Sequence, residues 1–112
     1  MQSDRELLEL AAKAAGIDGE YRQLLTGDGI SRRGVSERPW NPLTDDGDAL
    51  RLACELRIHV GFFRGMVAVQ GPKGGQKSVP IRENGAGEPT RRAIVLAAAE
   101  IGIQTKEVND AN

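Results

Sequence analysis

The sequence predicts an α+β fold, built as a helix/antiparallel sheet/helix sandwich with three helices and three or four strands. Two observations carry this prediction. Three segments repeat apolar residues at the three- and four-residue spacing of a helix buried on one side. Between the second and third of them, the apolar residues recur at the two-residue spacing of strands. Because each helix has an apolar stripe, the sheet can be covered on one face or on both, and the first helix decides which.

A single domain is expected over residues 1–103, followed by a flexible tail over residues 104–112. A chain of 112 residues buries roughly two thirds of its unfolded surface, enough for one core without crosslinks. The only cysteine, Cys54, falls on the apolar side of a predicted helix, which predicts a buried thiol in a reducing compartment. The chain does not open on a basic and then apolar stretch, and no apolar run is long enough to span a bilayer. We therefore expect a soluble, cytoplasmic protein.

The first helix is predicted over residues 4–15. Ser3 or Asp4 can cap it, and Gly16 is placed to end it. Its apolar stripe consists of Leu7, Leu8, Ala11, Ala12 and Ala15. Residues 16–43 are rich in glycine and proline and are predicted to be a loop with room for one short strand.

A second helix is expected after Thr44, which can cap it. Its first turn holds three carboxylates, where exposed amides and the helix dipole stabilise negative charge: Asp45, Asp46 and Asp48. Its predicted apolar face comprises Leu50, Ala53, Cys54 and Leu56. The acidic cluster lacks the alternating ligands, sixth-position glycine and final glutamate of a calcium loop, so no metal site is predicted.

Three antiparallel strands follow, over residues 58–63, 66–70 and 76–82, joined by a turn at 64–65 and a looser one at 71–75. Pro80 places the third strand at an edge of the sheet. A third helix then starts at Pro89, with a buried stripe of Ile94, Ala97, Ala98 and Ile101, and Gly102 is predicted to end it.

A local basic region lies within residues 71–92 of a chain whose net charge is −1. Its cations include Lys73, Lys77, Arg91 and Arg92. Arg91 and Arg92 fall in the predicted first turn of the third helix, where they oppose the helix dipole. A bound anion such as phosphate would relieve that conflict. The alternative is that these arginines are solvated and balanced by Glu88.

Two single residues also have open interpretations. Trp40, in the loop before the second helix, can be a stacking platform or partner anchor, or it can pack on the core. His59 is the only histidine; it is structural if both sheet faces are covered and can touch a ligand if one is open. No second histidine, cysteine pair or activated nucleophile accompanies it, so we predict no catalytic residues, no cofactor and no enzymatic activity.

Residues 40–53 (Trp-Asn-Pro-Leu-Thr-Asp-Asp-Gly-Asp-Ala-Leu-Arg-Leu-Ala), with residues 91–95 and 97–102, resemble the phage ABA sandwich domain family of small tailed-phage and prophage proteins. The resemblance implies a helix/sheet/helix sandwich encoded by a phage. The insert Gly-Pro-Lys-Gly-Gly at 71–75 departs from that pattern. Residues 45–103 are also similar to double-stranded RNA-binding domains in their order of helix, three strands and helix, and in the basic start of the last helix. They lack that family's histidine-proline loop between the first two strands.

These observations predict a non-enzymatic phage accessory protein that acts by binding in the host cytoplasm. Analogy with other small phage proteins suggests that it inhibits a host-defence component by occupying a protein surface or sequestering a nucleotide-like ligand. The predicted ligand-binding residues are Arg91, Arg92, Lys73, Lys77 and Trp40. A nucleic-acid-binding module and a virion structural or assembly protein are the alternatives, and the oligomeric state stays open.

Overall fold

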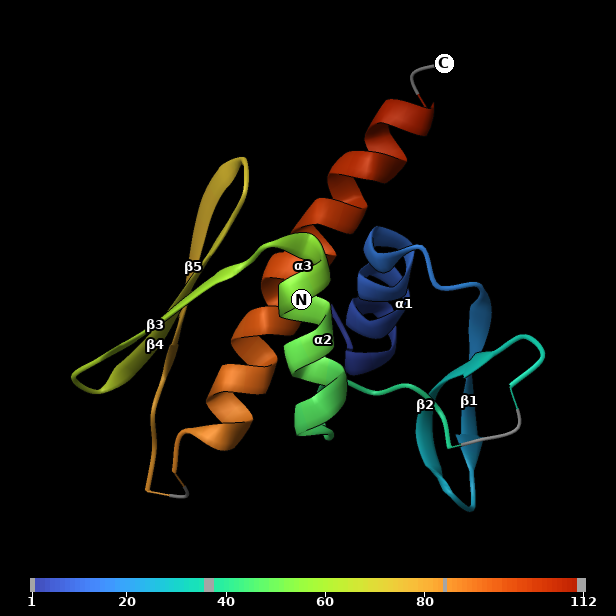
Figure 1. Cartoon of the computed structure of the whole chain (residues 1–112), viewed down its shortest axis with the longest axis horizontal. Coiled ribbons are helices and arrows are strands. Elements are labelled where there is room, and N and C mark those ends of the chain that lie inside the picture. The colour runs from blue at the N-terminus through green and yellow to red at the C-terminus, as the bar shows by residue number, and fades with distance from the viewer. Residues whose placement is uncertain (1, 36–37, 84, 111–112) are drawn as a thin grey trace.

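A computed structural model describes residues 2–35, 38–83 and 85–110, with the backbone alone for residues 106–110. Eight elements follow one another along the described chain (Figure 1). They are α1 (Asp4–Ala15), β1 (Gly19–Leu24), β2 (Gly27–Arg32), α2 (Asp46–Leu56), β3 (His59–Phe63), β4 (Met66–Gly71), β5 (Gly74–Pro80) and α3 (Gly87–Asp110). The predicted α+β class with three helices is confirmed, and the described residues contain five strands where three or four were expected.

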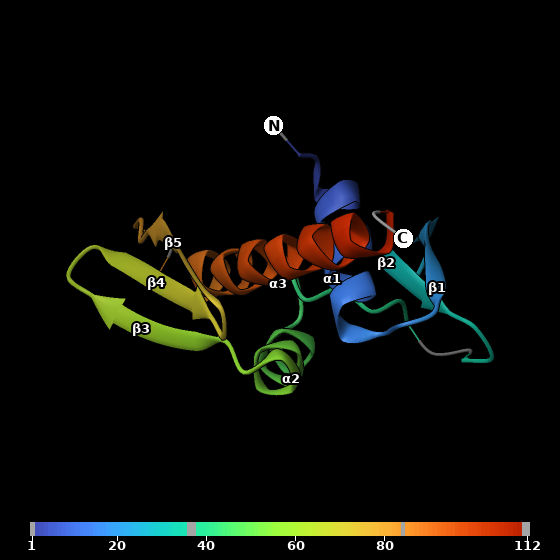
Figure 2. The same cartoon turned by 90° about the horizontal axis from the view of Figure 1, so that it is seen from above.

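The strands form two separate antiparallel sheets, β1–β2 and β3–β4–β5. Figure 1 shows the helices between these sheets. Helix α3 packs against β4 and β5 on one side and against α1 and α2 on the other, and α1 contacts β1 and β2. In Figure 2 all three helices lie on the same side of β3–β4–β5. The layer order therefore differs from the expected sandwich: α1 packs on α3 instead of covering the outer face of the sheet.

The close approach of α1 and α3 explains this layer order. Helix α1 begins and ends as predicted, since the Ser3 hydroxyl accepts a hydrogen bond from the Glu6 amide at 3.2 Å and Gly16 adopts a left-handed conformation with φ of 72°. Helix α3 faces it at Gly102, where the α1 backbone at Leu10 lies directly against the helix. Small side chains let two helices approach closely, so α1 finds its apolar partner in α3.

Gly102 was predicted to end the third helix, and this prediction is wrong. Helix α3 continues to Asp110, so the backbone is helical over residues 104–110, where a flexible tail was predicted. Gly102 is buried against α1, and a Cβ atom there would collide with the carbonyl oxygen of Leu10. Glycine is needed here for close packing, although the same residue in a sequence signals a helix end.

Residues 16–43 do not form the loop that was predicted. They contain a hairpin in which Gly19 pairs with Arg32 and Leu24 with Gly27. Ile30 carries its one buried apolar side chain, and its backbone exchanges two hydrogen bonds with Trp40, of 2.8 and 2.9 Å. With a single buried apolar side chain, the hairpin lacks the apolar alternation that identifies strands, and its glycines favour a loop instead.

Helix α2 starts one residue later than expected, because Asp45 caps it by accepting a hydrogen bond from the Asp48 amide at 2.8 Å. Its apolar face was also misplaced. The buried positions are Asp48, Ala49, Leu52 and Ala53. Leu50 and Cys54 are exposed, so the prediction of a buried thiol is wrong. Because Asp48 is buried at the start of the helix, the buried face of α2 is shifted by about one residue from the predicted face.

The three-stranded sheet agrees with the prediction for its first two strands, while the third begins at Gly74 and ends at Pro80 instead of spanning 76–82. Strand β4 is central, so β3 and β5 are the edges, as Pro80 indicated for β5. Val67 and Val69 of β4 are buried. The β3–β4–β5 sheet lies on the opposite side of the helices from the β1–β2 hairpin (Figure 1).

Candidate functional site

Arg91 of α3 lies in the second turn of the helix, because the helix begins at Gly87, two residues before the expected start. Its Nε donates a hydrogen bond to the Leu43 carbonyl oxygen at 2.9 Å, and its Nη1 lies 2.6 Å from Asp46 Oδ1. The Arg91 side chain is mostly buried. These contacts tie α3 to the segment that leads into α2, so the guanidinium is already paired within the protein.

The other predicted anion-binding residues do not gather around Arg91. Arg92 pairs with Asp4 across 3.1 Å, and Lys77 pairs with Glu100 across 3.6 Å. Lys73 is exposed in the β4–β5 turn, at a shallow cavity of roughly 300 Å³ beside the later turns of α3. Arg92 and Glu100 are eight residues apart on one helix, which is about 12 Å along its axis. The four cations thus form two separate groups.

Trp40 is only 4% exposed and belongs to the hydrophobic core. The interpretation of Trp40 as a packing residue is confirmed, and its ring offers no open face for stacking. The backbone around it holds the loop against β2 through Ile30. A Cβ at Gly29 would also collide with the Trp40 carbonyl oxygen, so glycine is required where β2 meets this loop.

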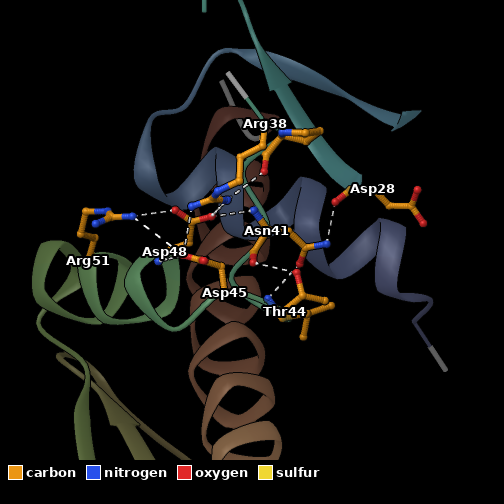
Figure 3. Close-up of polar contacts among 9 residues, drawn as sticks. Asp28, Arg38, Asn41, Thr44, Asp45, Asp48 and Arg51 are labelled. Atoms are coloured by element: carbon orange, nitrogen blue, oxygen red, sulfur yellow. Dashed lines mark hydrogen bonds and ion pairs between the residues drawn. The ribbon is translucent and has the colours of Figure 1, made fainter. Parts of the chain in front are cut away.

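The most highly connected polar group is Asp48, at the start of α2 (Figure 3). Its carboxylate is 3% exposed and accepts three charge-assisted or amide hydrogen bonds. The donors are Arg38 Nη1 at 2.9 Å, Arg51 Nη2 at 2.9 Å and the Asn41 amide at 3.0 Å. Burial by itself raises the pKa of Asp48, but these donors outweigh it and hold the pKa below its ordinary value.

Asp48 and its neighbours hold the loop of residues 38–44 against α2. Asn41 contributes on both sides, because its side chain donates to the Asp28 carbonyl oxygen at 2.8 Å and accepts from the Leu43 amide at 2.9 Å. The three acidic residues of this helix start diverge, since Asp46 turns away to Arg91. Among the described residues, no group of three or more histidine, cysteine or acidic side chains gathers in a metal-binding arrangement. These residues form a structural cluster, here called the clasp: Arg38, Asn41, Asp45, Asp48 and Arg51. Each of its charged side chains is paired with an opposite charge inside the cluster.

Strand β3 is an edge strand that carries exposed apolar side chains. It pairs with β4 on one side only, leaving its other backbone edge free. Val60 and Phe62 lie opposite Val69 and Val67, so all four side chains share a face of the sheet. Helix α3 covers that face at β4 and β5 but not at β3. Phe62 consequently remains 64% exposed, whereas Val67 is fully buried.

The other face of the same hairpin is apolar as well. Phe63 and Met66 lie opposite each other there, and Phe63 is 60% exposed. The Phe63 ring lies over Gly61. His59 is exposed on this face, which no described helix covers (Figure 2). Strand β3 therefore presents aromatic side chains on both faces beside a free backbone edge.

The two edges of this sheet differ in how they are protected. Strand β5 carries Lys77 and ends at Pro80, and its pairing with β4 is irregular near Gly71. Charges, prolines and irregular pairing are the usual means by which edge strands avoid further pairing. The five residues of β3, in contrast, are His59, Val60, Gly61, Phe62 and Phe63. This strand has none of those protections, so it is the candidate functional site.

Comparison with known proteins found no family model, no curated protein and no solved structure that matches this chain. None of the helices in the described ranges is both long and apolar enough to cross a membrane.

The residues that predict a strand in the sequence also contain a signal for this site. Residues 58–63 place apolar side chains on both faces of the predicted strand, and they include no acidic residue, lysine, arginine or proline. Such a segment suits a strand buried on both sides, yet here it lies at an edge. What the sequence could not supply was how far α3 extends across the sheet.

Proposed function

We propose that this protein is a non-enzymatic binding protein that recognises a protein partner by strand addition at β3. In this mode an extended segment of the partner pairs with a free strand edge, and alternate side chains of the segment contact the flanking faces. The single observation that carries the proposal is the coincidence on β3 of a free backbone edge and exposed aromatic side chains. The resemblance to phage ABA sandwich proteins supports a phage accessory protein whose partner is a host protein in the cytoplasm.

The exposed apolar area at β3 is substantial for one strand. Phe62 and Phe63 are 64% and 60% exposed, which corresponds to about 250 Å² at roughly 200 Å² per phenylalanine. A stable interface buries about 800 Å² on each partner. The two rings would thus supply nearly a third of that area, and the backbone edge, Val60 and Met66 would add to it. An aromatic anchor near the centre of a contact is typical of the residues that dominate binding energy.

Binding of an anionic ligand has weaker support than binding of a protein partner at β3. Arg91, Arg92 and Lys77 each have an acidic partner, and an added phosphate would have to displace Asp46, Asp4 or Glu100. The same pairing weakens the alternative of double-stranded RNA binding. The order α2, β3, β4, β5, α3 agrees with that family. However, the arginines that would contact phosphates are neutralised within the fold.

The proposal is tested by capturing partners from a bacterial host lysate with the full-length protein and two matched variants. Phe62→Lys puts a charge on the β3 face, and Leu25→Lys puts the same charge on the fully exposed tip of the opposite hairpin. Both positions are exposed, so both variants should fold like the wild type, as circular dichroism would verify. We expect Leu25→Lys to retain the specific partner and Phe62→Lys to lose it. Equal recovery of the partner by both variants would reject β3 as the binding site.

A further inference from the structure

We infer that the segment recognised at β3 is an extended apolar strand flanked by acidic residues. The inference rests on the proposed function and adds the chemistry of the partner. Strand β3 itself carries no charge, but arginines stand directly outside both of its ends: Arg57 lies two residues before His59, and Arg64 follows Phe63. An added strand would therefore meet a positive side chain at each end of its apolar centre.

Both arginines are available to a partner. Each is exposed, and neither forms an ion pair or a side-chain hydrogen bond with another described residue. The arginines at the start of α2 and its contact with α3 are engaged: Arg38 and Arg51 bind Asp48, and Arg91 binds Asp46. The ends of β3 therefore differ from the start of α2, where these arginines have acidic partners.

The backbone at Arg57 gives independent support. Arg57 has φ of 57° and is the only non-glycine residue with positive φ among the described residues. It ends α2 in the left-handed conformation, where its amide and that of Ile58 close the helix onto the Cys54 and Ala53 carbonyl oxygens. Glycine is the usual residue at such a position because a side chain is strained there. The fold requires the left-handed conformation here but not an arginine side chain, and a side chain kept at such a strained position is a reason to look for its function.

A second copy of the same chain fits this edge poorly. A symmetric antiparallel pair centred on Gly61 places Arg57 opposite Gly65 of the other copy and Ile58 opposite its Arg64. The two arginines would then be neighbours at both ends of the paired strands. Like charges across a strand pair are unfavourable, whereas carboxylates at these positions would be attracted. Charge complementarity thus favours an acidic-flanked partner over self-association.

The test is a binding titration of the full-length protein against two pools of synthetic peptides. Both pools have the same five-residue centre, matched to the length of β3, in which valine, isoleucine or phenylalanine alternates with threonine. One pool has two glutamates at each end and the other has two lysines. Fluorescence anisotropy of a labelled peptide measures affinity, and light scattering measures the mass of the free protein. Variants Arg57→Gly and Arg64→Ser remove the charges without adding bulk.

We expect the glutamate-flanked pool to bind roughly tenfold more tightly, since two exposed ion pairs replace two repulsions. The preference should disappear in the Arg57→Gly/Arg64→Ser double variant, while Phe62→Lys should weaken both pools. Equal binding of the two pools by the wild type would overturn the acidic-flank inference and leave strand addition in place. Binding of neither pool would count against strand addition itself. A dimer that Phe62→Lys converts to a monomer would also overturn the inference, because it would make a second copy the occupant.

Discussion

Asp48 shows how one side chain determines the structure before α2. Its carboxylate is buried, yet three donors reach it, two from the loop of residues 38–44 and one from α2. The hydrogen bonds to Arg38 raise the pKa of that guanidinium and lower the pKa of Asp48, so the pair stays ionised. A buried ionised group is favourable only when its hydrogen bonds are complete. The clasp should therefore be sensitive to the loss of a single charge.

We predict that Asp48→Asn lowers the free energy of unfolding by about 2 kcal/mol, because an amide NH₂ group would face donors that now have no acceptor. Denaturant unfolding at neutral pH measures this change. The matched control is Asp18→Asn, which removes an exposed ion pair with Arg33 and should cost less than about 0.5 kcal/mol. Equal effects of the two substitutions would show that the clasp does not stabilise the fold.

The same residue predicts a pH dependence. The native pKa of Asp48 lies below its unfolded value, so its stabilising contribution is complete above the ordinary aspartate pKa of about 3.9. That contribution is lost as the pH falls through this value toward the lower native pKa. The stability difference between the wild type and Asp48→Asn should consequently narrow in acid. Unfolding curves recorded at neutral pH and near pH 3 give this difference directly, and a constant difference would contradict the pKa shift.

Arg57 provides a prediction in which stability and function move in opposite directions. Relief of a left-handed non-glycine residue gains about 1–2 kcal/mol, while the flexibility of an unfolded glycine costs about 0.5–1 kcal/mol. Arg57→Gly should therefore raise the free energy of unfolding by roughly 0.5–1 kcal/mol while weakening binding at β3. Arg57→Ala is the control, since it removes the charge but retains the strained Cβ and should bring no such gain. Thermal unfolding of the three proteins tests this ranking.

At the scale of elements, the packing of α1 on α3 depends on Gly102. We predict that Gly102→Ala lowers the free energy of unfolding by about 2–4 kcal/mol, because the added methyl group would overlap the Leu10 carbonyl group and force the helices apart. The control is Gly71→Ala in β4, where an added Cβ atom would be 3.6 Å or more from its neighbours, an ordinary contact distance. This control should change the free energy of unfolding by less than about 0.5 kcal/mol. Equal destabilisation by both would exclude a specific contact at Gly102.

Helices and strands with a strong apolar period could be predicted from the sequence. Elements that depend on contacts between residues distant in the sequence could not. The cap at Ser3, the left-handed Gly16 and the β3–β4 hairpin follow from local rules, and the structure has them. The β1–β2 hairpin and the second half of α3 were missed because glycine has two uses, in turns and in close packing. Its use at Gly102 becomes clear only once Leu10 is known to lie opposite. The site had the same limit: Arg91 and Arg92 were predicted to bind an anion or to be balanced by Glu88, because their partners Asp46 and Asp4 are distant in the sequence.

At the scale of the whole molecule, where the net charge is −1 and most arginines have acidic partners, the proposed protein binding and the nucleic-acid alternative predict different salt dependences. We predict that affinity for the partner captured through β3 falls by about tenfold or less between 50 and 200 mM salt, because two arginines at most contribute charge. A protein that neutralises six to ten phosphates would lose about 10³–10⁵ in affinity over that range. Isothermal titration at the two salt concentrations measures the change, and a steep loss would favour the nucleic-acid alternative.

The arrangement of layers explains why β3 is available to a partner. Helix α3 packs on α1 and α2 and contacts β4 and β5 of the larger sheet, while α1 contacts the β1–β2 hairpin (Figure 1). A third layer over the outer face, as in a helix/sheet/helix sandwich, is not formed by the described residues. The molecule thus leaves one strand with both faces and an edge exposed, at the end farthest from β1–β2.

The most direct test of strand addition is amide hydrogen exchange of the full-length protein with and without a saturating amount of the glutamate-flanked peptide pool. An added strand would give the free edge of β3 new hydrogen-bond partners, so its amides should exchange more slowly in the complex. We predict that the new protection is concentrated in residues 59–63 and leaves β5 and the β1–β2 hairpin unchanged. New protection at β5 or at the hairpin, with none in β3, would contradict the account.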